Sequence, residues 1–318
     1  MGMQSILTRG FFRFAASAIV VLFVATGLSH ASLFVSSYGA DSVLRYNEVT
    51  GEVTGYGASG SGLFEPTGLA FGQDGNLYVA TRSPDRIARY NAATGAFIDT
   101  FASGGGLGTP NDIIFGHDGN LLVASQAGHQ VLRYNGSTGA FMNVFASGSG
   151  LGIPGGLDFG PDGNLYVTSF DTSQIFRFNG TTGAFMNVFA TSTGSSMTCS
   201  VFGPDGNLYA SAYQDNTIRR FNGLTGASMG TFVTAGNGGL STPYDLAFGP
   251  DGHLLVCSSG SNSILRYNGS TGAFMNVFAS SNGLFQPALM TFDVPEPGGL
   301  SAIAMLLLVA RRRRGALP

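Results

Sequence analysis

The sequence predicts an all-β protein, a six-bladed β-propeller that forms one domain over residues 32–293. Three observations support this fold. An Arg-aromatic-Asn triplet recurs six times, at steps of 44, 44, 44, 43 and 46 residues. Each copy holds four short apolar segments separated by turn residues, and no long stretch has helical periodicity. Units of this length with four strands are typical of propeller blades. The triplets begin at Arg45, Arg89, Arg133, Arg177, Arg220 and Arg266.

One copy shows how each strand is predicted. Residues 154–159 are apolar at alternating positions and end at the turn Gly-Pro-Asp-Gly-Asn, which leads into a second apolar segment over 165–168. Gly and Asn accept the positive φ of a tight turn, so this pair of segments predicts a hairpin. Residues 175–178 form the third strand, and the turn at 179–183 leads into the fourth strand over 184–189.

The two ends of the repeat region predict how the ring closes. The first copy begins at residues 33–35, which match the second strand of a blade and lack a first strand before them. Residues 287–292 repeat the Pro-to-Phe interval of residues 66–71. We therefore expect the C-terminal strand to complete the N-terminal blade, which removes exposed sheet edges.

Composition and charge exclude several classes of protein. Hydrophobic residues make up 44% of the chain, so it is not intrinsically disordered, and its 49 glycines follow no collagen-like period. The 15 basic residues are all arginine; nine of them lie in residues 32–293 against 17 acids, a formal charge of −8. This charge argues against nucleic acid as a partner. Cys199 and Cys257 form at most one bridge and have no zinc-site spacing.

The N-terminus predicts export. Residues 1–14 carry two arginines, residues 15–25 are an apolar run, and Ser29-His30-Ala31 fits a signal-peptide cleavage site. The alternative is a membrane anchor, but about 11 residues of helix span only ~17 Å of a ~30 Å hydrocarbon core. We therefore expect a signal peptide over residues 1–31, cleaved after Ala31.

The C-terminal segment, residues 294–318, predicts a sorting signal. Pro295, Glu296 and Pro297 precede a short apolar helix over 298–310 and then four arginines, which would stay on the cytoplasmic side. This order resembles the PEP-CTERM tail. The resemblance implies an exosortase-type protease as partner, only a transient membrane-anchored precursor, and delivery to the cell surface or extracellular matrix.

A residue that is repeated in every blade is explained by the blade, so we look for a site where copies differ. The third-strand arginines and the Asp-Gly turns are architecture by this test. The differences gather where the innermost strands begin and line the channel mouth, which makes Glu65, Asn111, Asp112 and Asp245 candidates. Facing carboxylates raise one another's pKa or bind a cation, and their oxygen donors favour calcium. The alternative is that these acids accept hydrogen bonds from backbone amides.

The loops between second and third strands supply other candidates. His129 is a possible base there, although an exposed loop histidine is the simpler interpretation. The matching loops of other blades carry residues that together predict a varied polar face where a partner would dock: Arg82, Asp85, Asp171, Tyr213 and Asp215.

The whole repeat region resembles a known group of propellers. The phrase Phe-Gly-x-Asp-Gly-Asn-Leu-Tyr-Val followed by Ile-x-Arg-Tyr is similar to NHL-type propellers, streptogramin lyases and calcium-dependent lactonases of the gluconolactonase type. The lactonase resemblance implies calcium bound by Glu65, Asn111 and Asp245, which match by residue type. Their register differs, however, and the usual tryptophan is absent. A lyase is disfavoured because the blade that carries His129 has no glutamate.

Taken together, the sequence favours an exported binding or structural module over an enzyme. Its neutral polar loops suit contacts with extracellular polysaccharide or a surface protein. The alternative is a calcium-dependent lactonase-type hydrolase at the channel mouth. No cofactor is indicated beyond calcium.

Overall fold

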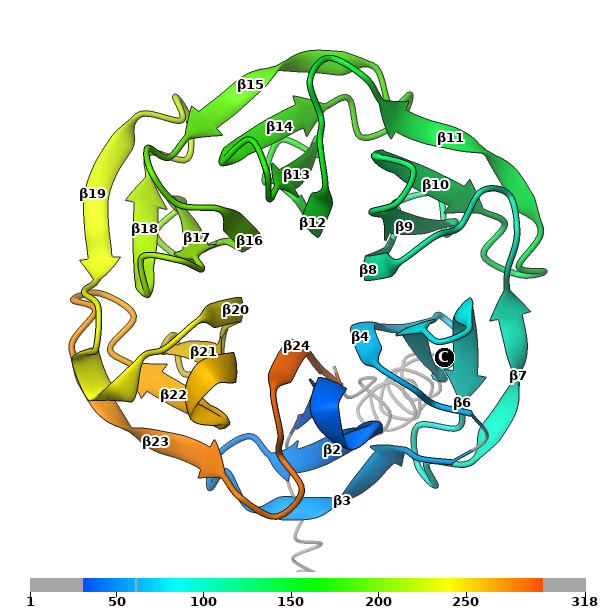
Figure 1. Cartoon of the computed structure of the whole chain (residues 1–318), viewed down its shortest axis with the longest axis horizontal. Coiled ribbons are helices and arrows are strands. Elements are labelled where there is room, and N and C mark those ends of the chain that lie inside the picture. The colour runs from blue at the N-terminus through cyan, green and yellow to red at the C-terminus, as the bar shows by residue number, and fades with distance from the viewer. Residues whose placement is uncertain (1–30, 61, 294–318) are drawn as a thin grey trace, which may run out of the picture.

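The computed structural model describes residues 31–60 and 62–293. These residues form six four-stranded antiparallel sheets that are arranged as blades around a central axis (Figure 1). The predicted six-bladed propeller is confirmed. The predicted signal peptide and C-terminal helix fall on residues 1–30 and 294–318, outside the described part of the chain.

Each blade runs from an inner strand at the channel to an outer strand at the rim. Blade 1 comprises β24 (Pro287–Phe292), β1 (Ser32–Ser37), β2 (Ser42–Asn47) and β3 (Val53–Ala58). Blade 2 comprises β4 (Pro66–Phe71), β5 (Leu77–Arg82), β6 (Asp85–Tyr90) and β7 (Phe97–Ala102). Blade 3 comprises β8 (Pro110–Phe115), β9 (Leu121–Ser125), β10 (Gln130–Tyr134) and β11 (Phe141–Ser147).

The other three blades follow the same order. Blade 4 comprises β12 (Pro154–Phe159), β13 (Leu165–Ser169), β14 (Gln174–Phe178) and β15 (Phe185–Thr191). Blade 5 comprises β16 (Met197–Phe202), β17 (Leu208–Ala212), β18 (Thr217–Phe221) and β19 (Ser228–Val233). Blade 6 comprises β20 (Pro243–Phe248), β21 (Leu254–Ser258), β22 (Ser263–Tyr267) and β23 (Phe274–Ser280). Short 3-10 turns add η1 (Tyr38–Ala40), η2 (Asn237–Gly239) and η3 (Ser259–Ser261).

The ring closes as the sequence predicts. β24 pairs antiparallel with β1, with Leu33 opposite Phe292 and Val35 opposite Met290. The buried hydroxyl of Ser36 donates to the carbonyl of Leu289 at 3.0 Å and accepts from its N–H at 2.8 Å. Strands from the two ends of the propeller thus share one sheet (Figure 1), and neither inner edge is left open.

The repeated residues hold the end of the propeller where the inner strands finish. In the Asp-Gly-Asn turn of blade 4, the Oδ1 of Asp162 accepts from the N–H of Asn164 at 3.1 Å. Arg177, from the third strand, forms an ion pair with Asp162 at 2.5 Å. The interpretation of these residues as architecture is confirmed by equivalent pairs in other blades: Arg89–Asp74, Arg133–Asp118 and Arg266–Asp251.

Aromatic side chains join neighbouring blades. Tyr166 is buried and lies edge-on between Phe189 of its own blade and Phe202 of the next, with both ring centroids 4.9 Å away. Tyr78 and Tyr209 make the same arrangement in blades 2 and 5. Such edge-to-face contacts add to the free energy of burial, so these tyrosines contribute to the packing between blades.

A bulge at the start of most inner strands positions the site. In β8 the pairing shifts between Pro110 and Ile113, and in β20 it shifts between Pro243 and Leu246. A bulge changes the direction of the side chains within it. The second and third residues of these strands are therefore freed from the regular alternation, and they supply the polar groups described below.

Candidate binding site at the channel mouth

Six equivalent positions surround the end of the channel where the inner strands begin. Each lies seven residues before the third-strand arginine, at the end of the second strand or just after it. The six positions carry five different residue types, and all six side chains are half-buried. They are Tyr38, Arg82, Gln126, Phe170, Tyr213 and Ser259.

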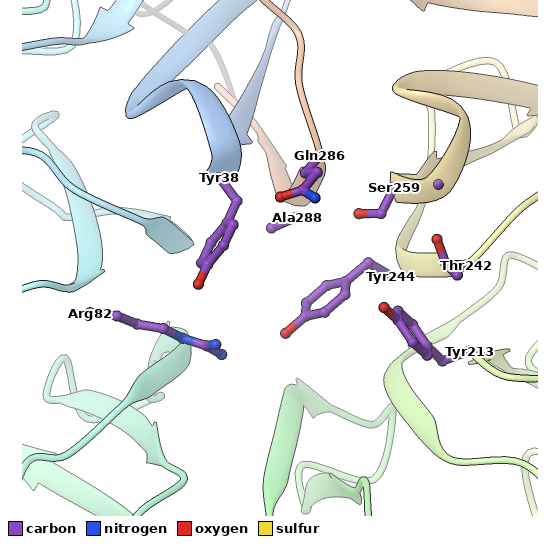
Figure 2. A pocket seen from close by; sticks show the side chains of 9 residues that line it. Tyr38, Arg82, Tyr213, Thr242, Tyr244, Ser259, Gln286 and Ala288 are labelled. Atoms are coloured by element: carbon purple, nitrogen blue, oxygen red, sulfur yellow. The ribbon is translucent and has the colours of Figure 1, made fainter.

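Four of these side chains frame a cavity of about 270 Å³, which we call the mouth pocket. In Figure 2 the hydroxyl groups of Tyr38 and Tyr244 point toward the guanidinium of Arg82. The lining comes from blades 1, 2, 5 and 6 and is made mainly of neutral polar and aromatic groups. It consists of Tyr38, Arg82, Tyr213, Thr242, Tyr244, Ser259, Gly260, Gln286 and Ala288.

Arg82 is fixed on one side of the pocket. Its Nη2 donates to Oδ1 of Asn111 at 2.6 Å and to Oε1 of Gln126 at 3.0 Å. Its guanidinium carbon lies 5.7 Å from the ring centroid of Tyr38. The guanidinium is therefore held in one orientation by neutral groups.

Tyr244 lies across the channel beside Arg82. Its hydroxyl donates to Oδ1 of Asn111 at 2.7 Å, and the two residues come from blades 6 and 3, which are opposite each other in the ring (Figure 1). Burial raises the pKa of Tyr244 to about 12, although nearby Arg82 acts in the other direction, so the hydroxyl stays protonated and can donate. Asn111 is only 1% exposed, and its Nδ2 has no partner among the described residues.

Aromatic rings form another side of the pocket. The ring of Tyr213 lies 5.9 Å from that of Phe170 and 6.3 Å from that of Tyr244, and both contacts are edge-on. Tyrosine combines a flat apolar face with a hydroxyl donor at the tip. This side of the pocket can therefore contact a ring and bond to its substituents.

Asp112 and Asp245 lie in a second cavity inside the channel, of about 440 Å³, and not in the mouth pocket. One oxygen of Asp112 accepts from the N–H of Leu157 at 2.8 Å, and Asp245 accepts from the N–H of Met290 at 2.9 Å. Each carboxylate thus links its inner strand to that of the next blade. The alternative stated above, that these acids bond backbone amides, is confirmed.

A third acid in the same cavity was not predicted. Asp158, at the fifth position of β12, accepts from the N–H of Phe202 at 3.0 Å. Burial raises the pKa of Asp158 and of Asp245 to about 7, and the amide hydrogen bonds only partly oppose it. Burial, followed by the charge of Asp245, also raises the pKa of Asp112. The channel therefore holds acids that take up protons near neutral pH.

The residues predicted to bind calcium lie in different places. Glu65 lines a small depression at the rim with Tyr38 and Asp41, Oδ1 of Asn111 already accepts two hydrogen bonds, and Asp245 faces the channel cavity. Within residues 31–60 and 62–293, no three His, Cys, Asp or Glu side chains gather where they could hold a metal ion. Calcium at Glu65, Asn111 and Asp245 stays a prediction.

His129 lies apart from the mouth pocket. It is exposed, has a positive φ of 52° in the turn before β10, and its N–H donates to the carbonyl of Gln126 at 3.1 Å. Its side chain lines neither the mouth pocket nor the channel cavity. The simpler interpretation, an exposed loop histidine, fits this placement.

Two acids of the predicted polar face accept hydrogen bonds from backbone N–H groups and so have a structural role. Oδ1 of Asp85 accepts from the N–H of Thr109 at 2.9 Å, and Oδ1 of Asp171 accepts from the N–H of Ile153 at 3.0 Å. Asp85 thus holds the residue before the inner strand of the next blade, and Asp171 holds the residue before the inner strand of its own blade. Of the residues predicted on this face, Arg82 and Tyr213 line the pocket. Sequence reasoning missed Tyr38, Tyr244 and Gln286, although an alignment on the third-strand arginines places Tyr38 beside Arg82 and Tyr213.

Comparisons with known proteins agree on the fold. The model for "WD domain, G-beta repeat" matches residues 183–222, which span about one blade. No curated protein matches the chain. Among solved structures, the nidogen/laminin complex contains a similar chain, with a TM-score of 0.70 and 18% identity over 84% of this chain and 99% of that one.

Two other solved structures are similar. A protein of unknown function from Bacteroides caccae has a TM-score of 0.65 and 17% identity, with 84% of this chain and 100% of that chain covered. A catalytically inactive virginiamycin B lyase from Staphylococcus aureus with quinupristin has a TM-score of 0.53 and 18% identity over 73% and 71% of the two chains. At these identities the likeness shows a shared fold, and function has to be argued from the site.

Proposed function

We propose that this protein is an exported propeller that acts as a binding module for extracellular polysaccharide, and that the mouth pocket is its binding site. The observation that carries this proposal is the set of equivalent positions at the mouth, where blades that are otherwise alike place different side chains around one cavity. Differences at structurally equal positions have no explanation in the architecture of the blade.

The chemistry of the lining supports a sugar as ligand. Tyrosine, serine, threonine and glutamine side chains offer hydroxyl and amide groups that both donate and accept, as sugar hydroxyls do. Tyr213 and Tyr244 add aromatic surface at low conformational cost. A cavity of about 270 Å³ lies just below the usual ~300–1,000 Å³ of small-molecule sites, which suits one ring of a longer chain.

The alternative, a calcium-dependent lactonase-type hydrolase, has less support from the geometry. It requires Glu65, Asn111 and Asp245 around one ion, but Glu65 and Asp245 line separate cavities. Oδ1 of Asn111 is engaged by Arg82 and Tyr244. A binding role requires no such cluster.

The proposed destination is the cell surface or extracellular matrix. Support comes from the predicted signal peptide and from the tail at Pro295, Glu296 and Pro297, which would bring the precursor to an exosortase-type protease. Among the described residues, no helix has the length and apolar character needed to cross a bilayer. We expect fractionation of the source cells to recover the protein outside the membrane, and alanine substitution of the three motif residues to leave a membrane-bound precursor.

Binding of the full chain to an array of neutral and acidic oligosaccharides tests the proposed function. We expect a subset of glycans to bind, and Tyr213→Ala to weaken that binding about fivefold or more, since stacked aromatic contacts contribute roughly 1 kcal/mol or more. Tyr56→Ala is the matched control, because Tyr56 is 58% exposed on β3 at the rim. Absence of glycan binding, or equal loss in both variants, contradicts the proposal.

A further inference from the structure

Arg82 differs from the arginines of the blade framework because it lines a cavity and, within the described part of the chain, has no ion pair. Arg89, Arg133, Arg177, Arg219 and Arg266 each form an ion pair with an aspartate. Arg45 and Arg220 form none among the described residues, but they lie over the rings of Phe34 and Phe232 and do not line the mouth pocket. Among the ion pairs of the described residues, Arg82 has none. Its hydrogen-bond acceptors are neutral: the side chains of Asn111 and Gln126 and the carbonyl of Pro110.

The surroundings of Arg82 leave its charge uncompensated. It is half-buried at the mouth pocket, between the hydroxyl groups of Tyr38 and Tyr244. Two acids near Arg82 have other partners: Glu65 interacts with the hydroxyl of Tyr38, and Asp85, opposite Arg82 in the pairing of β5 with β6, accepts from the N–H of Thr109. A partly desolvated cation gains most from an anionic partner, and the planar guanidinium fits a carboxylate with two hydrogen bonds.

We propose that the sugar bound at the mouth pocket is acidic, and that Arg82 binds its carboxylate. This inference rests on the proposed function and names the ligand class for the same site. The contacts to Asn111, Gln126 and Pro110 fix the guanidinium before the ligand arrives, which lowers the entropy cost of binding. Oδ1 of Asn111 accepts from both Arg82 and Tyr244 and so holds these two pocket residues relative to each other.

The charge of the protein favours a uronic acid over a densely charged ligand. Residues 32–293 carry a formal charge of −8, which opposes the approach of a highly sulfated polymer. One carboxylate on a ring needs only one cation, and among the described residues Arg82 is the only arginine that lines the mouth pocket. The aromatic rings of Tyr213 and Tyr244 are available for the rest of the sugar.

The test is calorimetric titration of the full chain with a trisaccharide of galacturonic acid and with its methyl ester. The two probes have the same rings, but the ester has no charge. We expect the acid to bind the wild-type protein about tenfold or more tightly than the ester, because a charge-assisted hydrogen bond contributes roughly that much. Arg82→Gln should weaken binding of the acid about 10- to 100-fold and binding of the ester much less, so that the difference in affinity between the two probes is largely lost.

Arg219→Gln is the matched control. It removes the same charge from the same chain, but Arg219 pairs with Asp215 and Thr231 outside the pocket. We expect it to change neither affinity by more than about twofold, because Arg219 is half-buried outside the pocket and salt screens its charge over distance. If Arg82→Gln does not fold, Arg82→Lys serves instead; it keeps the charge, loses the two-pronged geometry and should bind the acid with an intermediate affinity.

The outcomes separate this inference from the proposed function. Equal affinity for acid and ester, unaffected by Arg82→Gln, overturns the role of Arg82 and leaves saccharide binding in place. Binding of a sulfated trisaccharide in preference to the uronate overturns the choice of carboxylate. If no saccharide binds, but a peptide with a free carboxylate binds in an Arg82-dependent way, the proposed function and the sugar class both fail.

Discussion

The two ends of the propeller are built from the same repeat but carry different chemistry. Where the inner strands finish, blade after blade has an Asp-Gly turn tied to a third-strand arginine, as in the pair Arg177–Asp162. Where they begin, the equivalent positions of six blades hold five residue types, from Phe170 to Arg82. The first end gives most blades the same support, and at the second end the six blades present different side chains.

This comparison separates residues that specify the fold from residues available for a ligand. Tyr166 is repeated in kind in other blades, is buried, and packs between two blades. Tyr213 is a tyrosine in the same propeller, but it is half-buried at the pocket and contacts other residues of the varied face. Chemically identical side chains should therefore have very different effects on stability and on binding.

The largest expected effect tests this contrast directly. Tyr166→Ala removes a fully buried ring and should lower the free energy of unfolding by about 3–5 kcal/mol. Tyr213→Ala should lower it by roughly 1 kcal/mol, as for a partly exposed side chain away from the core. Urea unfolding of both variants measures the difference. Similar losses of stability would mean that the mouth is as much a part of the core as the repeated framework.

A smaller effect concerns the buried acids of the channel, which lies between the two ends of the propeller. Because burial raises the pKa values of Asp158 and Asp245 to about 7, the folded protein keeps protons there that the unfolded chain, with pKa near 3.8, releases. Their contribution to stability is full below pH 4 and is lost as the pH rises to about 7. A rise of about three pKa units sets an upper limit of roughly 4 kcal/mol on the loss for each carboxylate, and we expect the measured loss to be smaller than that for Tyr166→Ala.

Asp158→Asn combined with Asp245→Asn checks this contribution. Asparagine imitates the protonated acid, so the decline of the urea midpoint between pH 4 and 7 should be smaller in the double variant than in the wild type, with the remainder due to Asp112. Asp99→Asn, on the outer strand β7, is the control and should retain the wild-type profile. A wild-type stability that rises over this range relative to the double variant would show that the carboxylates are stabilised, and not penalised, by their surroundings.

The smallest expected effect concerns Asp85, which has a structural role at the mouth. Its Oδ1 accepts a hydrogen bond from the N–H of Thr109, which has a positive φ of 48°. Asp85→Ala should lower the free energy of unfolding by about 1 kcal/mol. Asp85→Asn should be nearly neutral, because Asn262 makes the same contact with Gln286 in another blade. A large loss of stability in Asp85→Asn, measured by thermal unfolding, would show that the negative charge of Asp85, and not only its hydrogen bond, stabilises the folded protein.

Much of the fold could be predicted because its signals are local. The turn at Asp162 and the spacing of the third-strand arginines repeat within about 44 residues, and these recurrences predict the number of blades. Closure was also predictable, because a strand missing from one end of a repeat and present at the other has only one place to go. The pairing of β24 with β1 confirms it.

Less of the site could be predicted because it depends on distances across the ring. Asn111 was singled out as a calcium ligand, yet its contact with Tyr244 spans 133 residues and depends on bulges in two strands. Asp112 and Asp245 were placed at the mouth, whereas they lie in the channel cavity, because the sequence does not give the direction of side chains within a bulge. Asp158 escaped notice because only the third position of each inner strand was compared.

Because of the hydrogen bond between Tyr244 and Asn111, the geometry of the pocket depends on the whole closed ring. The donor and the acceptor come from blades that are not neighbours in the ring, so the bond forms only while the intervening blades, including the one shared by the two chain ends, keep their places. A ligand bound in the mouth pocket then stabilises the closed ring relative to an opened one, and more so the tighter it binds. Ligand binding and ring closure are therefore coupled: a change that weakens the pairing of β24 with β1 weakens binding, and a bound ligand stabilises that pairing.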